Sequence, residues 1–297
     1  MVAHNTRHTF MDLTAKEVRA AIEARLQGEV ATLAQRGITP GLAVLRVGDN
    51  PESAAYVGRK VKLAGELGIV SRNIQLPEQT TQEALEAEIA ALNADSAIHG
   101  ILCQLPLPAH ISESRITTLI DPAKDVDCFH PANFGLLAQG IPRFLPCTPA
   151  GIVEMLRHYD IATSGAHVVI LGRSNIVGRP LALMLGHKGL DATVTVCHSR
   201  TPDLAAQAAR ADILVAAIGR PEWVGPEMVK EGAVVIDVGI NRVDDPSRPR
   251  GYRLCGDVDY QAVAPRARAI TPVPGGVGPL TVTMLMQNTL TAAGIAR

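Results

Sequence analysis

An apolar run followed by a glycine-containing turn constrains the fold of this chain more than any other feature. His167–Leu171 is short and rich in β-branched residues, and Gly172 and Gly178 follow it in the sequence GRSNIVG. The run fits a strand buried on both faces of a parallel sheet, and Gly178 is expected to open a helix. Backbone N–H groups and the helix dipole at such a turn favour an anion. We predict a nucleotide phosphate here, although an ordinary tight turn explains the glycine spacing alone equally well.

Alternating strand and helix patterns surround this turn. After His167–Leu171, three further apolar runs with helical segments between them occur at residues 192–196, 213–218 and 234–238. This order predicts a doubly wound α/β sheet, which binds its ligand at the carboxyl ends of its strands. The first third of the chain alternates in the same way and predicts a second parallel sheet. Its strands are expected at residues 42–47, 70–76 and 100–105.

A long connection rich in Pro and Gly at residues 121–144 separates the two halves. Connections of this length are functional or join domains. We predict an N-terminal α/β domain over residues 1–146, on which residues 280–297 return to pack, and a Rossmann-like nucleotide-binding domain over residues 147–279. Residues 1–10 are expected to form a polar tail.

The composition excludes several classes of protein. A net charge of −1 and 3% aromatic residues argue against nucleic acid and anionic membranes as partners. The five cysteines are scattered and contain no C-x-x-C, which argues against a disulfide framework and a zinc site and for a reducing compartment. No apolar run reaches the length of a membrane span, and no signal-peptide core is present. We therefore expect a cytoplasmic enzyme.

The residues that follow the second nucleotide-domain strand favour NADP as the cofactor. Enzymes that prefer NAD place Asp or Glu about 20 residues beyond the glycines, to bind the ribose 2′-hydroxyl. This chain has the sequence CHSR there, with no acidic residue. Ser199, Arg200 and the turn residue Arg173 suit a 2′-phosphate instead, because guanidinium groups bind phosphate bidentately. The alternative is that both arginines are solvated surface residues.

Polar residues in the first half form a second set of candidates. Tyr56 and Lys60 are four apart and share a helix face, although a tyrosine packed on a lysine stem has the same spacing. Gln104 ends a strand, where ligands gather, or is simply solvated. Asp125 and Asp127 point the same way if their segment is extended. They are candidate metal ligands, but we favour a solvated acidic loop.

A histidine and a glycine-rich segment each allow two interpretations. His130 is a candidate base, although a surface or hydrogen-bonded histidine is the commoner case. The glycines of residues 274–279, PGGVGP, indicate unusual backbone angles or close approach to a ligand, and the alternative is a flexible loop.

Eight segments together resemble the bifunctional methylenetetrahydrofolate dehydrogenase/methenyltetrahydrofolate cyclohydrolase family. The resemblance covers nearly the whole chain after about residue 12, and the segments follow the order of the family. They are SAAYVGRK at 53–60, GILCQLPLP at 100–108, KDVDCFHP at 124–131, PCTPAGI at 146–152, GRSNIVGRP at 172–180, DVGIN at 237–241, GDVDY at 256–260 and PGGVGPLT at 274–281.

The resemblance implies two reactions and one cofactor. It implies NADP-dependent oxidation of 5,10-methylenetetrahydrofolate to the methenyl cation, and hydrolysis of that cation to 10-formyltetrahydrofolate. It also implies a homodimer. We expect the active site in the cleft between the two domains and no bound metal. A monofunctional dehydrogenase of the same family and a non-catalytic folate- or nucleotide-binding relative are the alternatives.

The resemblance also assigns residues. Lys60 is similar to the catalytic lysine of the family, Tyr56 to its partner over the substrate, Gln104 to the residue that tunes the lysine and Asp127 to the carboxylate that binds the pterin. The further substrate-binding residues are Ser53, Pro274, Gly275 and Gly276. The residues expected to bind NADP are Gly172, Arg173, Ser174, Ile176, Gly178, Ser199, Arg200, Thr148, Ile240 and Thr281.

The residue types suit this chemistry. A lysine transfers protons near neutral pH if burial lowers its pKa, and Gln104 would hold it without adding a negative charge. Two positions depart from the family pattern. Cys128 stands where the family has Gly, and Leu280 stands where it has Met or Phe, so both bear on how the substrate fits.

Overall fold

The computed structural model describes residues 10–295, which form two compact units. Unit 1 holds the described residues up to Val18 and Thr148–Leu280, and unit 2 holds Arg19–Cys147 and the described residues from Thr281 onward. The predicted domains differ from these units at the N-terminus, because the strand β1 (Met11–Asp12) pairs with the last strand of the unit 1 sheet. Except for Phe10, the predicted polar tail lies outside the described residues.

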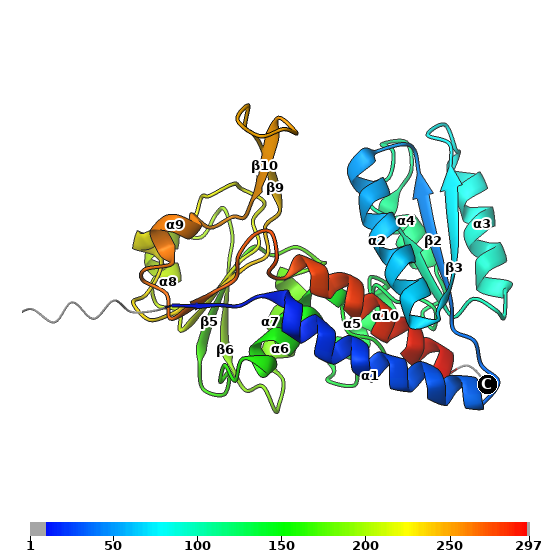
Figure 1. Cartoon of the computed structure of the whole chain (residues 1–297), viewed down its shortest axis with the longest axis horizontal. Coiled ribbons are helices and arrows are strands. Elements are labelled where there is room, and N and C mark those ends of the chain that lie inside the picture. The colour runs from blue at the N-terminus through cyan, green and yellow to red at the C-terminus, as the bar shows by residue number, and fades with distance from the viewer. Residues whose placement is uncertain (1–9, 296–297) are drawn as a thin grey trace, which may run out of the picture. The chain divides into compact units, whose positions relative to one another are not determined.

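Unit 1 is built on a parallel sheet, of which Figure 1 labels the strands β5 and β6. Six of the described strands follow the order β1-β11-β8-β7-β5-β6. The strands after β1 are β5 (His167–Leu171), β6 (Thr193–Cys197), β7 (Ile213–Ala216), β8 (Val234–Asp237) and β11 (Ala269–Ile270). The predicted doubly wound pattern is confirmed. β1 and β11 have two residues each and are too short to leave a hydrophobic pattern in the sequence.

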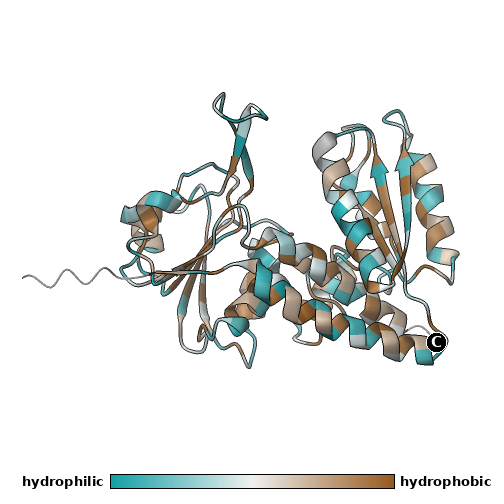
Figure 2. Ribbon diagram, viewed as in Figure 1, coloured by the Kyte–Doolittle hydropathy of each residue, from teal (hydrophilic) through white to brown (hydrophobic). Residues whose placement is uncertain are grey.

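Helices and a hairpin complete unit 1. The helices are α6 (Cys147–His158), α7 (Gly178–Gly186), α8 (Leu204–Ala208), the 3-10 helix η1 (Pro226–Met228) and α9 (Tyr260–Val263). One apolar cluster packs α8, η1 and α9 against one face of the sheet, whose strands are mostly brown in Figure 2. The strands β9 (Asn241–Asp244) and β10 (Tyr252–Cys255) form an antiparallel hairpin.

Unit 2 contains a parallel sheet of order β3-β2-β4, three strands among the described residues (Figure 1). The central strand β2 (Gly41–Val47) is buried on both faces, between β3 (Val70–Leu76) and β4 (Gly100–Cys103). The unit also holds most of α1 (Ala15–Gln35), the helices α2 (Pro51–Leu67), α3 (Gln82–Ala94), α4 (Glu113–Leu119) and α5 (Pro131–Ala138), and most of α10 (Gly278–Ile295). The strands and helices predicted in the first third of the chain are confirmed.

The helix α5 is the one difference in the predicted connection at residues 121–144. His130 is its N-cap, with Nδ1 accepting from the N–H of Ala132, and Pro131 stands in its first turn. The prolines and glycines of this segment were interpreted as interruptions, whereas Pro131 starts a helix because its missing N–H costs nothing there. The histidine is therefore hydrogen-bonded as a helix cap, which is the second of the two interpretations of His130. Among the described helices, none is long and apolar enough to span a membrane.

Candidate functional site

One face of α2 carries three of the predicted site residues. Ser53 and Lys60 are buried, with Lys60 only 8% exposed, and Tyr56 is half-buried. The guanidinium carbon of Arg59 lies 4.3 Å from the centre of the Tyr56 ring. Residues three, four and seven apart follow one side of a helix, so these side chains form a single row. The spacing S-x-x-Y-x-x-x-K therefore places a hydroxyl, a ring and an amine side by side.

Lys60 and Gln104 are hydrogen-bonded to each other. The Lys60 ammonium donates to Gln104 Oε1 at 2.9 Å, and Gln104 Nε2 donates to the carbonyl oxygen of Leu105 at 2.8 Å. The N–H of Gln104 donates to the carbonyl oxygen of Leu45 on β2, so the parallel sheet fixes the backbone of Gln104. Gln104 is thus not a solvated residue at a strand end. It orients the lysine through a neutral oxygen, which stabilises the ammonium less than a carboxylate does.

Asp127 supplies the negative charge of this site. The carboxyl group is half-buried, and burial raises its pKa, while the Lys60 ammonium and a hydrogen bond with Cys147 lower it. The Asp125 carboxylate raises the pKa of Asp127 further. Lys60, Gln104, Asp127 and Cys147 therefore lie together in unit 2.

Asp125 differs from the sequence prediction of a solvated acidic loop. It is buried, and its carboxylate accepts hydrogen bonds from the N–H groups of Phe129 and His130 and from Asn133 Nδ2 at 2.8–3.1 Å. A buried carboxylate persists where donors replace its hydration. Asp125 therefore fixes the loop that carries Asp127. No group of three or more metal-ligating side chains occurs within residues 10–295.

Sequence reasoning missed two residues that hold Asp127. Cys147 hydrogen-bonds the Asp127 carboxyl, and burial together with the Asp127 charge raises the pKa of the Cys147 thiol well above its ordinary value. Asn288, on α10, donates from Nδ2 to the carbonyl oxygens of Val126 at 2.7 Å and Leu145 at 2.8 Å. PCTP was recognised only as a family segment, and Asn288 lies in a helix of mixed residues without a local signal.

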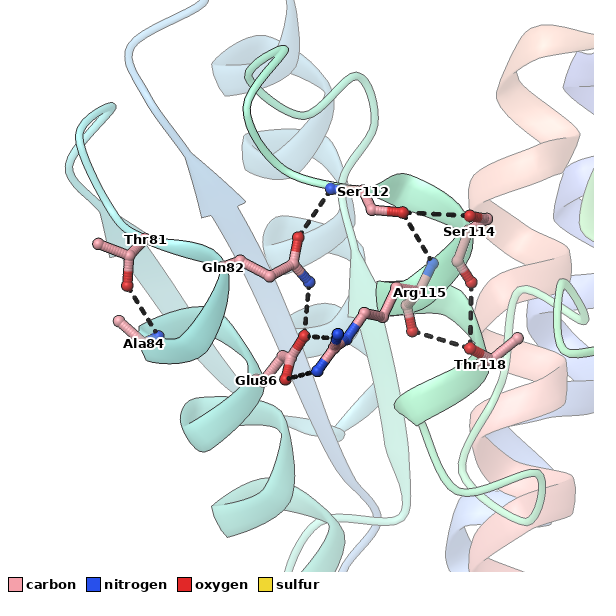
Figure 3. Close-up of polar contacts among 8 residues, drawn as sticks. All are labelled: Thr81, Gln82, Ala84, Glu86, Ser112, Ser114, Arg115 and Thr118. Atoms are coloured by element: carbon pink, nitrogen blue, oxygen red, sulfur yellow. Dashed lines mark hydrogen bonds and ion pairs between the residues drawn. The ribbon is translucent and has the colours of Figure 1, made fainter.

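A polar network fixes the far end of the loop that begins at Gln104. Gln82 on α3 accepts from the N–H of Ser112 at 2.7 Å and donates to Glu86 at the same distance (Figure 3). Arg115 on α4 donates to Glu86 at 2.9 Å (Figure 3). The loop after Gln104 is therefore tied at one end to β2 and at the other to α3. This anchoring limits the conformations that Gln104 can adopt.

Cys128, the first departure from the family pattern, has a left-handed backbone. Its φ is +63°, a region that L residues with a Cβ rarely adopt and glycine adopts readily. The side chain is 1% exposed, and Sγ lies 3.4 Å from the carbonyl oxygen of Phe144, to which it donates. Burial raises the pKa of this thiol to about 12. Cys128 therefore adopts a backbone conformation that glycine favours, and its thiol is buried in the interior.

The glycines of the opening turn in unit 1 have steric causes inside the fold. Gly172 has φ +120°, and a Cβ there would lie 2.2 Å from the Ala217 carbonyl oxygen. A Cβ on Gly178 would lie 2.1 Å from the Gly172 carbonyl oxygen. Some backbone N–H groups of the turn already have hydrogen-bond partners within it. The N–H of Val177 donates to Ser174 Oγ, and the N–H of Arg179 donates to the Ser174 carbonyl oxygen. The glycines thus allow β5, β7 and α7 to approach closely, and they do not by themselves prove a phosphate site.

The predicted phosphate-binding side chains share one edge of the unit 1 sheet. Arg173 follows β5, Ser199 and Arg200 follow β6, and all three are exposed. The N–H of Gly172 donates to the Cys197 carbonyl oxygen at 2.9 Å, which joins the two strand ends. Two guanidinium groups and a hydroxyl, with no acidic residue within residues 172–177 or 198–201, fit a phosphate monoester.

Further predicted cofactor and substrate residues of unit 1 lie in three segments. Ile176, in the turn, is 47% exposed, and Ile240, after β8, is 46% exposed. In the PGGVGP segment, Gly275 has φ +113°, its carbonyl oxygen accepts from Ala15, and Pro274 is exposed. A Cβ on Gly276 would lie 2.7 Å from the Pro272 carbonyl oxygen. The backbone geometry of the fold therefore explains both glycines.

Helix starts account for the other predicted residues. The helix α6 begins at Cys147, so Thr148 lies in its first turn. Thr281, in unit 2, lies in the first turn of α10. Leu280, the second departure from the family pattern, is buried, and its Cβ fills the space beside Gly151 at 2.8 Å from where a Cβ would stand. Its role in the structure is packing within unit 1.

Comparisons with known proteins agree with this arrangement. Residues 13–127 match the model of the tetrahydrofolate dehydrogenase/cyclohydrolase catalytic domain, and residues 146–297 match that of the NAD(P)-binding domain of the same enzymes. The chain is 55% identical over 282 residues to bifunctional protein FolD 1 of Myxococcus xanthus, which covers 95% of this chain and 97% of that protein.

Solved structures give the same result. The bifunctional enzyme FolD of Campylobacter jejuni superposes with a TM-score of 0.90 at 45% identity, over 96% of this chain and 99% of that one. The methylenetetrahydrofolate dehydrogenase-cyclohydrolase of Trypanosoma brucei, complexed with NADP and an inhibitor, superposes with a TM-score of 0.90 at 44% identity, over 96% and 97% of the two chains.

Proposed function

Because this chain belongs to the tetrahydrofolate dehydrogenase/cyclohydrolase family, we propose that it carries out both reactions of that family. It oxidises 5,10-methylenetetrahydrofolate with NADP and hydrolyses the resulting methenyl cation to 10-formyltetrahydrofolate. The observation that carries the assignment of residues is the hydrogen bond between buried Lys60 and Gln104 beside the Asp127 carboxyl.

Lys60 is the proposed proton-transfer group of the hydrolysis. Water attack on the methenyl carbon releases a proton, and opening of the ring requires one at the departing nitrogen. An amine held in one orientation accepts and returns that proton. Gln104 supplies this orientation through Oε1, and Tyr56, one turn earlier on α2, offers a ring against which the flat pterin system can stack.

Asp127 is the proposed anchor of the substrate. A pterin presents N–H donors, and a half-buried carboxylate accepts charge-assisted hydrogen bonds from them. Ser53, at the start of the same row as Tyr56, and the Pro274–Gly276 segment are proposed to bind the rest of the folate.

NADP is proposed to bind at the edge of the unit 1 sheet. When bound it supplies the hydride acceptor, and the chain supplies position and charge. Arg173, Ser199 and Arg200 hold the 2′-phosphate, and the turn residues Gly172, Ser174, Ile176 and Gly178 line the dinucleotide with Thr148, Ile240 and Thr281. Their fit rests on two exposed guanidinium groups with no acidic residue directly beside either of them in the sequence.

The finer parts of the proposal rest on the family resemblance. We propose a homodimer in the cytoplasm, with a catalytic domain over residues 19–147 to which the C-terminal segment belongs, and a nucleotide-binding domain over residues 148–280 whose sheet includes the strand β1. Tetrahydrofolate derivatives are its small-molecule partners, and neither nucleic acid nor a membrane is part of the reaction.

Two absorbance assays test the function. The first follows NADPH and methenyl formation from methylenetetrahydrofolate and NADP, and the second follows the loss of methenyltetrahydrofolate supplied directly. We expect both reactions to exceed the rate in buffer. Hydrolysis at the buffer rate would leave a monofunctional dehydrogenase, and the absence of both activities would leave a binding protein.

A further inference from the structure

Two buried carboxylates organise the loops at the carboxyl edge of the unit 1 sheet, and neither belongs to the residues assigned so far. Asp237 ends β8 and is 3% exposed, and Asp257 follows β10 and is 0% exposed. The N–H of Asp257 donates to Asp237 Oδ1 at 2.9 Å, so the two residues are linked directly.

Asp257 accepts hydrogen bonds from four donors. Oδ2 accepts from the N–H groups of Ile218 at 2.7 Å and Gly219 at 3.0 Å. Oδ1 accepts from the N–H of Arg220 and from Asn241 Nδ2, both at 2.9 Å. A single carboxylate thus binds consecutive amides of the loop after β7 and the first residue of β9. Four donors replace its hydration and keep the buried charge stable.

The loop that Asp257 holds adjoins the glycine turn. The N–H of Ala217 donates to Leu171 at the end of β5, and the Ala217 carbonyl oxygen occupies the space where a Gly172 Cβ would stand. Gly219 and Arg220 are exposed, so their N–H groups are turned inward to Asp257 while the loop meets solvent at the ligand-binding edge.

Asp257 also fixes Ile240 from one side. Asp237 Oδ1 accepts from the N–H of Gly239 at 3.0 Å, and Asp257 binds Asn241, so both neighbours of Ile240 are held by buried carboxylates. The approach is close, because a Cβ on Gly239 would lie 2.2 Å from Asp257 Oδ1 and one on Gly256 would lie 1.8 Å from Asp237 Oδ2. The backbone on either side of Ile240 therefore has little freedom.

We propose that Asp257 is a positioning residue for NADP, which sets the loop at residues 218–220 and Ile240 in the geometry that receives the dinucleotide. It acts through these backbone groups and does not touch the reacting atoms. The inference rests on the proposed NADP site and adds a residue whose effect is confined to cofactor use.

The test is Asp257→Asn, which keeps the shape and replaces one acceptor oxygen by an NH2 group. Two of the four N–H donors that now bind Asp257 would then face the new NH2 group, which is itself a donor. We expect the KM for NADP to rise about tenfold, as for the loss of one or two buried hydrogen bonds, with kcat at saturating NADP within about twofold of wild type. Hydrolysis of methenyltetrahydrofolate in the absence of NADP should stay at the wild-type rate.

Asp212→Asn is the matched control. Asp212 precedes β7, at the opposite edge of the same sheet, and its carboxylate also accepts a backbone N–H, that of His167 at 2.9 Å. This variant should leave the KM for NADP unchanged even where it lowers the melting temperature. An unchanged KM in Asp257→Asn, or parallel losses of both activities like those of a destabilised protein, would overturn the inference.

Asn241→Ala covers the case in which Asp257→Asn does not fold. It removes one donor and leaves Asp257 its three backbone partners. We expect a rise of about threefold in the KM for NADP, as for one hydrogen bond, and no rise would contradict the inference. A wild-type protein without dehydrogenase activity would instead refute the proposed function, so the two failures are distinguishable.

Discussion

The Lys60 site of unit 2 and the carboxyl edge of the unit 1 sheet are built in opposite ways. In unit 2 the chemistry lies in side chains that are partly or fully buried and already paired, as Lys60 is with Gln104. At the unit 1 edge the buried groups are glycines, backbone amides and two aspartates, while Arg173 and Arg200 are exposed. A site that moves protons needs fixed and desolvated groups, whereas a site that binds a polyanion needs a shaped backbone and accessible positive charge.

The largest expected effect is the loss of hydrolysis in Lys60→Met. The methionine keeps the length and apolar stem of the lysine and removes the amine, so we expect the hydrolysis rate to fall by about 10²–10⁴-fold, the usual contribution of a general acid–base group. Lys62→Met is the control, because Lys62 is on the same helix with its side chain 77% exposed. Hydrolysis by Lys60→Met at the wild-type rate would remove Lys60 from the mechanism.

The next largest effect is expected at the carboxyl edge of the unit 1 sheet, where NADP is proposed to bind. The double variant of Arg173→Ala and Arg200→Ala should raise the KM for NADP by about 10–100-fold, as for lost charge-assisted hydrogen bonds, and bring it close to the KM for NAD. Arg210→Ala, an exposed arginine before β7, should change neither value. A wild-type protein with equal kcat/KM for NADP and NAD would contradict the assignment of both arginines.

Asp127→Asn should separate function from stability within the Lys60 site. The neutral amide accepts weaker hydrogen bonds, so we expect the KM for methylenetetrahydrofolate to rise about tenfold. Burial raises the folded-state pKa of Asp127 above 3.8, so its carboxylate costs stability once the pH exceeds that value. The variant should melt at a higher temperature than wild type at pH 7. That gain should disappear as the pH falls below 3.8, and a gain that persists there would contradict this sign.

Part of this comparison could be predicted from the sequence. Apolar runs predicted the strands from β5 to β8 in unit 1 and the strands β2 and β4 in unit 2, and the spacing of Ser53, Tyr56 and Lys60 predicted their common helix face. The two-residue strands β1 and β11 left no such pattern. The hydrogen bonds of Cys147, Asn288, Asp237 and Asp257 could not be predicted, because they join residues far apart in the chain and no local pattern marks them. Asp125 was interpreted as solvated for a related reason. Its hydrogen-bond donors lie at the start of α5, a helix that was not predicted.

The smallest effect concerns Cys128 and compares Cys128→Gly with Cys128→Ala. Both variants lose the buried thiol, but only glycine adopts φ +63° without a steric cost. We expect the glycine variant to be more stable than the alanine variant by about 1 kcal/mol in the free energy of unfolding. Denaturant unfolding measures the difference, and an alanine variant of equal or greater stability would show that the left-handed backbone carries no cost here.

The difference between the two regions is tested most directly by the hydrolysis of methenyltetrahydrofolate without NADP, measured in Lys60→Met and in the Arg173→Ala, Arg200→Ala double variant. The residue assignments predict a loss of about 10²-fold or more in the first variant. They predict the wild-type rate in the second, because its substituted side chains bind only the cofactor. Equal losses in both variants, or a wild-type rate in Lys60→Met, would contradict the separation of proton transfer from cofactor binding.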